Sequence, residues 1–206
     1  MKNKAILILR ICAVVFAVFA LSYRLFINPI SRQSCIYQLG FFSMQSSIFI
    51  AVIFILLLVN QLRGKPDENV NPNFRGAALL YGIVTMLMFL AFFIGSFDLH
   101  GLNLIVLYIN HVVLAILLMI DNIITIKYQT YQWDLLLYWM IYPFYYLLFI
   151  IVEGLSFGHN RYYFLVFDKV NSSFYPFALL LMTFIFLIIG VMLIFWNRIY
   201  KRPLKP

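Results

Sequence analysis

Six apolar segments, each long enough to cross a lipid bilayer, constrain the fold of this chain more than any other feature. They cover about residues 6–27, 41–62, 76–97, 104–125, 135–152 and 174–196. A transmembrane α-helix needs about 20 predominantly apolar residues. Hydrophobic residues make up 65% of the 206 residues, more than a soluble domain of this length can bury. The sequence therefore predicts an all-α membrane protein, a six-transmembrane-helix bundle that forms one domain over residues 1–206.

The lysine and arginine residues predict how this bundle is oriented. With six spans, both termini lie on the same side of the membrane. That side receives eleven of the 15 lysine and arginine residues, and the opposite side receives four. Because cytoplasmic loops are enriched in these residues, we predict that both termini are cytoplasmic. The expected location is the plasma (cytoplasmic) membrane, as a multi-pass protein.

The net charge of +8 raises the question of a nucleic-acid partner. The basic residues lie in loops and at span ends, and no basic stripe interleaved with stacking aromatic residues is present in the sequence. We therefore predict no nucleic-acid partner. Arg10 and Arg24 lie near the two ends of the first span, from which long side chains are expected to reach the lipid headgroups.

A short polar stretch opens the second span, which is otherwise apolar. At helical spacing, Ser43, Ser46 and Ser47 share one face, at positions i, i+3 and i+4, and Gln45 points elsewhere. Serines in membrane helices often bond to their own backbone or allow helices to pack closely, so spacing alone favours a structural role.

The fourth span carries a histidine, His111, next to Asn110. An ionisable side chain within a span is costly, usually faces the bundle interior and marks a candidate site. Helical rise places His111 about 10 Å below the outer end of its span, and Ser47 about 6 Å below Ser43. We therefore expect the serine face and His111 at comparable depth, towards the outer face. Asp121 lies about 15 Å further along the same helix and is expected to make contacts between helices.

A serine and a histidine are the minimum for nucleophilic acyl transfer. In this hypothesis His111 takes the proton of Ser43, the Ser43 oxygen attacks an ester carbonyl, and the acyl-enzyme is hydrolysed. The group that orients His111 would be Glu153 or Asp98. The candidate oxyanion donors are Gln45, Asn110 or a tyrosine hydroxyl such as that of Tyr142.

Two other hypotheses remain open from the residues alone. In the first, zinc bound by His100, His111 and His159 with an acidic residue activates water, although the spacing is irregular and two of these histidines lie on loops. In the second, the protein binds or transports lipids without catalysis. A coupled transporter is expected to show an internal repeat, broken helices or mid-membrane charges, and the sequence pattern indicates none. We predict no cofactor for the serine–histidine mechanism.

The polar stretch also resembles a family pattern. The residues are Phe41-Phe42-Ser43-Met44-Gln45-Ser46-Ser47, and the pattern is aromatic-aromatic-Thr-x-Gln-Ser-Asn of bacterial predicted six-span proteins. Those proteins are similar to the androgen-induced membrane hydrolase family of animals. Other segments also fit this family. They are Arg75-Gly76, Asn110-His111 and Tyr142-Pro143-Phe144-Tyr145-Tyr146, and more weakly Tyr162-Tyr163-Phe164-Leu165-Val166-Phe167-Asp168.

This resemblance implies a six-span bundle that acts on lipids. Animal members of the family hydrolyse fatty-acid esters of hydroxy fatty acids with an intramembrane threonine nucleophile and a histidine. The threonine corresponds to Ser43 and the histidine to His111, while Ser47 replaces the asparagine of the bacterial pattern. The expected partner is a membrane lipid or fatty-acyl ester substrate, reached sideways from the outer leaflet.

Overall fold

A computed structural model describes residues 2–27, 35–94, 100–127, 130–157, 161–162 and 174–199. Within these ranges every regular element is helical, and six helices are long and apolar enough to cross a membrane. They are Lys4–Ile27, Phe42–Leu62, Pro72–Phe92, Leu102–Thr125, Asp134–Ser156 and Leu179–Ile199. This confirms the predicted set of six apolar helices and gives the chain the architecture of a multi-pass membrane protein.

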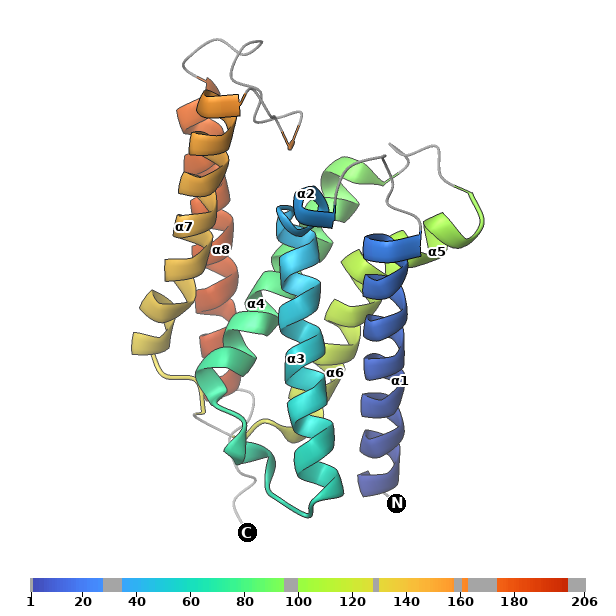
Figure 1. Ribbon diagram of the computed structural model, residues 1–206. Coiled ribbons are helices and arrows are strands. Elements are labelled where there is room, and N and C mark those ends of the chain that lie inside the picture. The colour runs from blue at the N-terminus through green and yellow to red at the C-terminus, as the bar shows by residue number, and fades with distance from the viewer. Residues whose placement is uncertain are drawn as a thin grey trace.

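Several spans are built from more than one helical segment (Figure 1). The first is α1 (Lys2–Ser22) followed by the π-helical η1 (Tyr23–Ile27), the second is α3 (Phe42–Leu62), and the third is α4 (Pro72–Met88) followed by the π-helical η3 (Phe89–Phe93). The fourth consists of α5 (Leu102–Tyr108), the π-helical η4 (Ile109–Val113) and α6 (Leu114–Thr125). Helices α7 (Asp134–Phe157) and α8 (Phe174–Ile199) complete the bundle, with a short α2 (Cys35–Leu39) and a 3-10 turn η2 (Asp67–Asn69) between spans.

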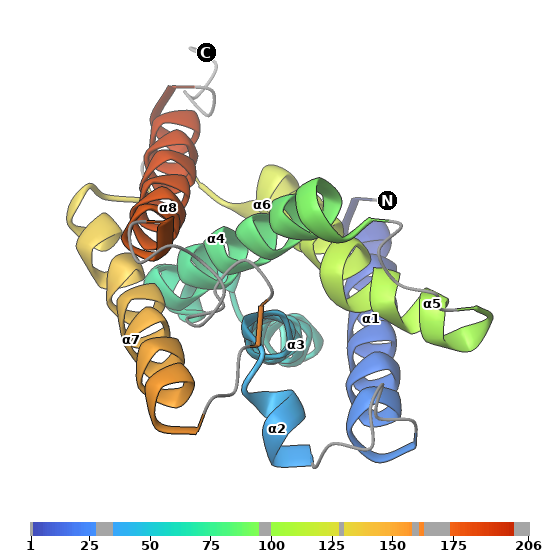
Figure 2. The same ribbon diagram turned by 90° about the horizontal axis from the view of Figure 1, so that it is seen from above.

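Helix α1 begins and α8 ends at the same end of the bundle, the lower end in Figure 1. We call this the terminal end and the opposite one the distal end. Viewed along the bundle, α3 lies in the middle, with α1, α5 and α6 on one side and α7 on the other (Figure 2). All three π-helical segments of the described chain belong to the distal half, where α1 and α4 end and the fourth span begins.

The core is formed by two clusters of buried apolar side chains. One joins α1, α3 and the fourth span, and there Ala13, Ala17 and Ala20 of α1 have no exposed surface. Small residues at this spacing let helix backbones approach closely, which is how membrane helices commonly pack. The other cluster joins α4 to α7 and α8 around Trp139. Large apolar side chains also cover the outward faces, as for Leu137 and Phe144, as expected for a surface in contact with lipid.

Some helix boundaries in the structure differ from those predicted from the sequence. The third span starts at Pro72 rather than near residue 76, because Pro72 occupies the first helical turn and the Asn71 side chain accepts a hydrogen bond from Asn73 N at 2.8 Å. The loop expected before the second span contains α2, and α7 continues to Phe157 beyond the predicted end at residue 152. Glu153 therefore lies on a helix and not in a loop.

Candidate functional site

The serine face of α3 ties this helix to two neighbours. The hydroxyl of Ser46 shares a hydrogen bond of 2.9 Å with that of Thr85 on α4. The hydroxyl of Ser47 donates to the carbonyl oxygens of Ser43 and Asn110, each at 2.9 Å. Both serines are buried. Their roles are thus structural, whereas the half-buried Ser43 hydroxyl makes no hydrogen bond to any residue that the structure describes.

His111 lies in the π-helical segment η4, where the wider turn takes backbone carbonyls out of the regular helical pattern. Its Nδ1 is 2.8 Å from the carbonyl oxygen of Leu107. A carbonyl only accepts hydrogen bonds, so Nδ1 carries the proton, and in the neutral ring Nε2 is the basic nitrogen. The imidazole also packs against the ring of Phe89, with centroids 4.7 Å apart.

These contacts fix the heights of the side chains relative to one another. Phe89 lies one turn distal to Thr85, and Ser43 about one turn distal to Ser46, so helical rise places Ser43 and Phe89 at a similar height. Helical side chains tilt toward the N-terminus of their helix, which directs the His111 ring toward the distal end. The structure thus brings the serine face and His111 into one distal region. No hydrogen bond joins Ser43 to His111 among the described contacts.

The side chains expected to support catalysis divide between two sides of α3. The Gln45 amide donates to Leu39 O at 2.9 Å and accepts from the Tyr142 hydroxyl of α7. The Gln45 and Tyr142 side chains are therefore hydrogen-bonded to each other. Asn110 differs, because its buried Nδ2 and Oδ1 have no partner within the described residues. Of Gln45, Asn110 and Tyr142, Asn110 is therefore the one whose side chain makes no hydrogen bond within the described residues.

Glu153 is held by Arg161, with both carboxylate oxygens bonded to the guanidinium. Arg161 also donates to Tyr37 O at 2.6 Å and fills the space next to Gly40, so the ion pair fastens the turn between α2 and α3. Tyr146 of α7 reaches the same turn, accepting from Phe42 N at 2.8 Å. Glu153 thus has a structural contact at the turn between α2 and α3. Asp98 lies outside the described residues.

The zinc hypothesis receives no support within the described part of the chain. No group of three histidine, cysteine, aspartate or glutamate side chains there is arranged to hold a metal ion. His100 is exposed just before α5, and His111 lies along the same span on η4. His159 lies outside the described residues.

A buried charge cluster at the terminal end was not predicted from the sequence. Arg10 donates from Nε to Asp121 Oδ1 at 2.8 Å and from Nη2 to Asp67 Oδ2 at 2.6 Å, and Arg75 donates to Asp121 Oδ2 at 2.6 Å. The side chains of Arg10, Arg75 and Asp121 are at most 2% exposed. The expectation that Arg10 and Arg24 reach the headgroups is therefore wrong. The face of α1 that carries Arg10 points into the bundle toward two carboxylates, and Arg24 is buried as well. The predicted interhelical role of Asp121 is confirmed.

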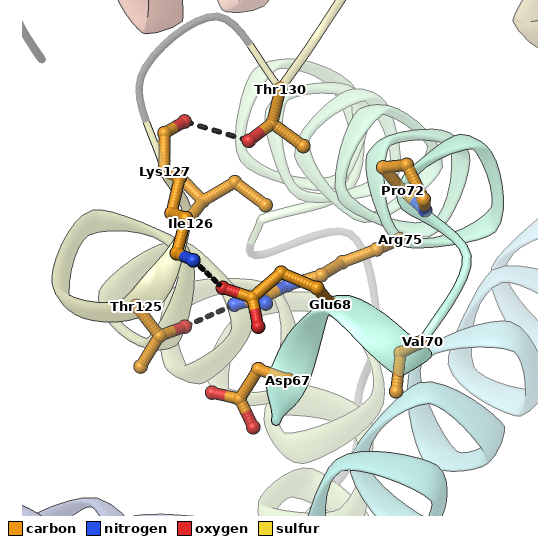
Figure 3. Close-up of a pocket in the computed structure, with 9 residues that line it drawn as sticks. All are labelled: Asp67, Glu68, Val70, Pro72, Arg75, Thr125, Ile126, Lys127 and Thr130. Carbon is orange, nitrogen blue, oxygen red and sulfur yellow. Dashed lines mark hydrogen bonds and ion pairs between the residues drawn. The ribbon is translucent and has the colours of Figure 1, made fainter. Parts of the chain in front are cut away.

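A cavity of about 150 Å³ opens beside this cluster. Figure 3 shows Lys127 and Glu68 meeting at the cavity and Arg75 reaching toward Thr125. The Lys127–Glu68 ion pair is 2.6 Å long and both side chains are largely exposed. Because the charged groups around this cavity pair with one another, its lining does not favour a ligand of either sign. The lining residues are Asp67, Glu68, Val70, Pro72, Arg75, Thr125, Ile126, Lys127 and Thr130.

Comparison of the chain with protein-family models, with curated proteins and with solved structures found no match. A functional assignment therefore rests on the chemistry of the residues and on how the helices bring them together.

Proposed function

We propose that this protein is an intramembrane lipid-ester hydrolase in which Ser43 is the nucleophile and His111 the general base. The observation that carries the proposal is the setting of His111. Leu107 holds the Nδ1 side of the ring, leaving Nε2 as the basic nitrogen, and the Ser47–Asn110 contact brings η4 against the serine face. The backbone carbonyl takes the orienting role that we expected of Glu153 or Asp98.

The reaction proceeds in two balanced halves. The Ser43 oxygen bonds to the ester carbonyl carbon as its proton passes to His111 Nε2. The C–O bond to the alcohol then breaks, and the imidazolium returns the proton to that oxygen. Water repeats the sequence on the acyl-Ser43 intermediate: its proton passes to Nε2, its oxygen bonds to the acyl carbon, and the bond to Ser43 breaks as the proton returns to the serine. Hydrogen bonds between a nucleophile and its base commonly tighten only in the substrate complex. The hydrogen bond between Ser43 and His111 therefore forms when the ester is bound.

Asn110 is the proposed oxyanion donor. Its Nδ2 has free hydrogens in a buried position, where a donor aimed at developing negative charge is most effective. The distal location of these residues corresponds to the outer half of the bundle in the predicted orientation. A lipid ester would then enter sideways from the outer leaflet.

The test uses purified protein in lipid nanodiscs with a fluorogenic long-chain fatty-acyl ester and a serine-reactive fluorophosphonate lipid probe. Ser43→Ala should abolish both hydrolysis and labelling, whereas Ser43→Thr should retain part of the hydrolysis because the hydroxyl remains. Thr183→Ala is the matched control, because it deletes a hydroxyl bonded only to the helix's own backbone, at Leu179 O. Labelling that persists in Ser43→Ala would refute the proposal.

A non-catalytic lipid-binding protein is the second candidate, and the buried Asn110 amide without a partner also favours it, because such groups are satisfied by a ligand. The two candidates differ in one measurement. A binding protein would release no fatty acid in the assay above.

A further inference from the structure

Arg24 carries a buried positive charge whose anionic partner is missing from the described part of the chain. It lies on η1, and 7% of its surface is exposed. Nη2 donates to Gln38 Oε1 at 3.2 Å, a neutral acceptor. The buried Nε and Nη1 make no hydrogen bond within the described residues. A charge buried without a counter-charge is costly, and such groups in membrane proteins mark sites for ions or substrates.

The acidic residues of the chain are committed elsewhere or lie outside the described ranges. No aspartate or glutamate precedes Asp67 in the sequence. Asp67 and Asp121 bind Arg10 at the terminal end, Glu153 binds Arg161, and Glu68 binds Lys127. Asp134 opens α7 at the terminal end. The described part of the protein therefore supplies no carboxylate to Arg24.

Helical register brings Arg24 to the same region as Asn110 and His111. The Arg10–Asp121 ion pair sets α1 beside the antiparallel fourth span. Ala20 lies as many residues from Arg10 along α1 as His111 lies from Asp121 along the fourth span, so Ala20 and His111 are at the same height in the bundle. Arg24 is one turn further along α1, and its long side chain tilts back toward the N-terminus. Helical register therefore places the Arg24 guanidinium and the His111 ring in the same distal region of the bundle.

We propose that Arg24 and Asn110 form a binding site for the anionic group of a membrane lipid, either a carboxylate or a phosphodiester, next to His111. The free hydrogens on Nε and Nη1 of Arg24 and one of the two on Nδ2 of Asn110 are donors to such oxygens, and the second Nδ2 hydrogen is left for the oxyanion. The Asn110 Oδ1 remains to accept from a hydroxyl or a water molecule. The inference rests on the proposed hydrolase and specifies its substrate class as an anionic lipid ester, with the charge held beside the base.

The experiment measures lipid binding by the purified full-length protein in an uncharged detergent. Oleate and dioctanoyl phosphatidylglycerol serve as the anionic probes, methyl oleate and dioctanoyl glycerol as their neutral counterparts, and inorganic phosphate as the free ion. Binding is read as the rise in melting temperature and as the dissociation constant from fluorescence titration. Binding by oleate alone identifies a carboxylate site, and binding by phosphatidylglycerol alone identifies a phosphodiester site.

Variants of Arg24 and of a control arginine distinguish binding at this site from nonspecific lipid binding. Arg24→Gln should weaken binding of the anionic probe at least tenfold, and Arg24→Lys should weaken it less. Arg63→Gln, which removes an exposed arginine at the terminal end, should bind as the wild type does. Because Arg24 has no described counter-charge, Arg24→Gln should melt no lower than the wild type without lipid, so lost binding would not reflect unfolding. Equal binding of neutral and anionic lipids, equal binding by Arg24→Gln, or binding of inorganic phosphate only would overturn the proposal.

Two further variants test an internal partner and the dependence on catalysis. If Asp98 or Asp168 neutralises Arg24, the wild type will bind no anionic lipid, while Asp98→Asn or Asp168→Asn will gain binding, and the proposal fails. Ser43→Ala should bind the anionic probe as tightly as the wild type does while losing hydrolysis. Hydrolysis that survives in Ser43→Ala with intact Arg24-dependent binding would refute the nucleophile and leave the anion site standing.

Discussion

The charge cluster at the terminal end predicts a large loss of stability when Asp121 is replaced by asparagine. Asp121 accepts hydrogen bonds from Arg10 and Arg75 on two different helices, and all three side chains are at most 2% exposed. Asp121→Asn keeps the size of the side chain and removes its charge. Two buried guanidinium groups then lose a shared counter-charge.

The magnitude follows from what each arginine retains. Arg10 keeps its two hydrogen bonds to Asp67, at 2.9 and 2.6 Å, so most of its charge stays compensated. Within the described residues, Arg75 keeps only the Thr125 hydroxyl and the Asp121 backbone oxygen, and both are neutral. Breaking a buried ion pair by removing one partner costs about 3–5 kcal/mol. With one pair fully broken, we expect a loss near the lower end, about 3 kcal/mol, or a melting temperature lower by roughly 6–12 °C for a protein of this size.

Thermal unfolding of the purified protein in mild detergent, followed by circular dichroism, measures this loss. Asp134→Asn is the matched control, because Asp134 is an exposed acid at the start of α7 and its replacement should shift the melting temperature little. Arg75→Gln combined with Asp121→Asn should recover part of the loss, since the uncompensated charge disappears with the arginine. A loss for Asp121→Asn no larger than that for Asp134→Asn would refute the reasoning that this cluster holds α1, α4 and α6 together.

Two further predictions concern packing and surface charge. Gly76→Ala should destabilise the protein by about 1–3 kcal/mol in the same unfolding assay, because the added methyl group collides with the buried ring of Trp139; an unchanged melting temperature would contradict this. Lys127→Gln should cost under about 1 kcal/mol, because the Lys127–Glu68 pair is largely exposed. The hydrogen bond from Lys127 lowers the pKa of the Glu68 carboxyl, so the contribution is present above the unfolded-state pKa and is lost as the pH falls through the folded-state pKa. The difference between Lys127→Gln and the wild type should therefore vanish in acid and in high salt, and a difference that grows in acid would contradict the assignment.

The sequence predicts the six helices well because each segment combines apolar composition with sufficient length. It also contains the start of the third span, since Asn71 followed by Pro72 is a helix-start signal that the hydropathy boundary at residue 76 obscured. It does not predict that Arg10 faces the bundle, because a single charge in a long apolar helix does not specify which face meets a partner. The two carboxylates that pair with Arg10 lie 57 and 111 positions away, and only tertiary packing brings them to it.

In the candidate site, too, the sequence predicts some features of the structure and not others. Helical spacing predicts that Ser43, Ser46 and Ser47 share a face, but it does not predict that Ser46 and Ser47 join neighbouring helices while the Ser43 hydroxyl stays without such a bond. The π-helical turns have no clear sequence signature, since one extra residue in a turn is compatible with the same apolar composition. Without η4, the contact between Ser47 and the Asn110 carbonyl and the setting of His111 are not foreseeable.

The two ends of the bundle treat buried arginine charges differently, and this contrast supports a functional interpretation of the distal end. At the terminal end the same first and fourth spans place Arg10 against Asp121, so these helices are able to neutralise a buried charge. At the distal end they carry Arg24, which has no carboxylate partner within the described residues, and Asn110. There, Nε and Nη1 of Arg24 and Nδ2 of Asn110 donate to no described residue. Unmatched donors are costly in a bilayer, where no water compensates them. Because the paired end fixes the register of the helices, the distal donors are held in fixed positions, as a binding site requires.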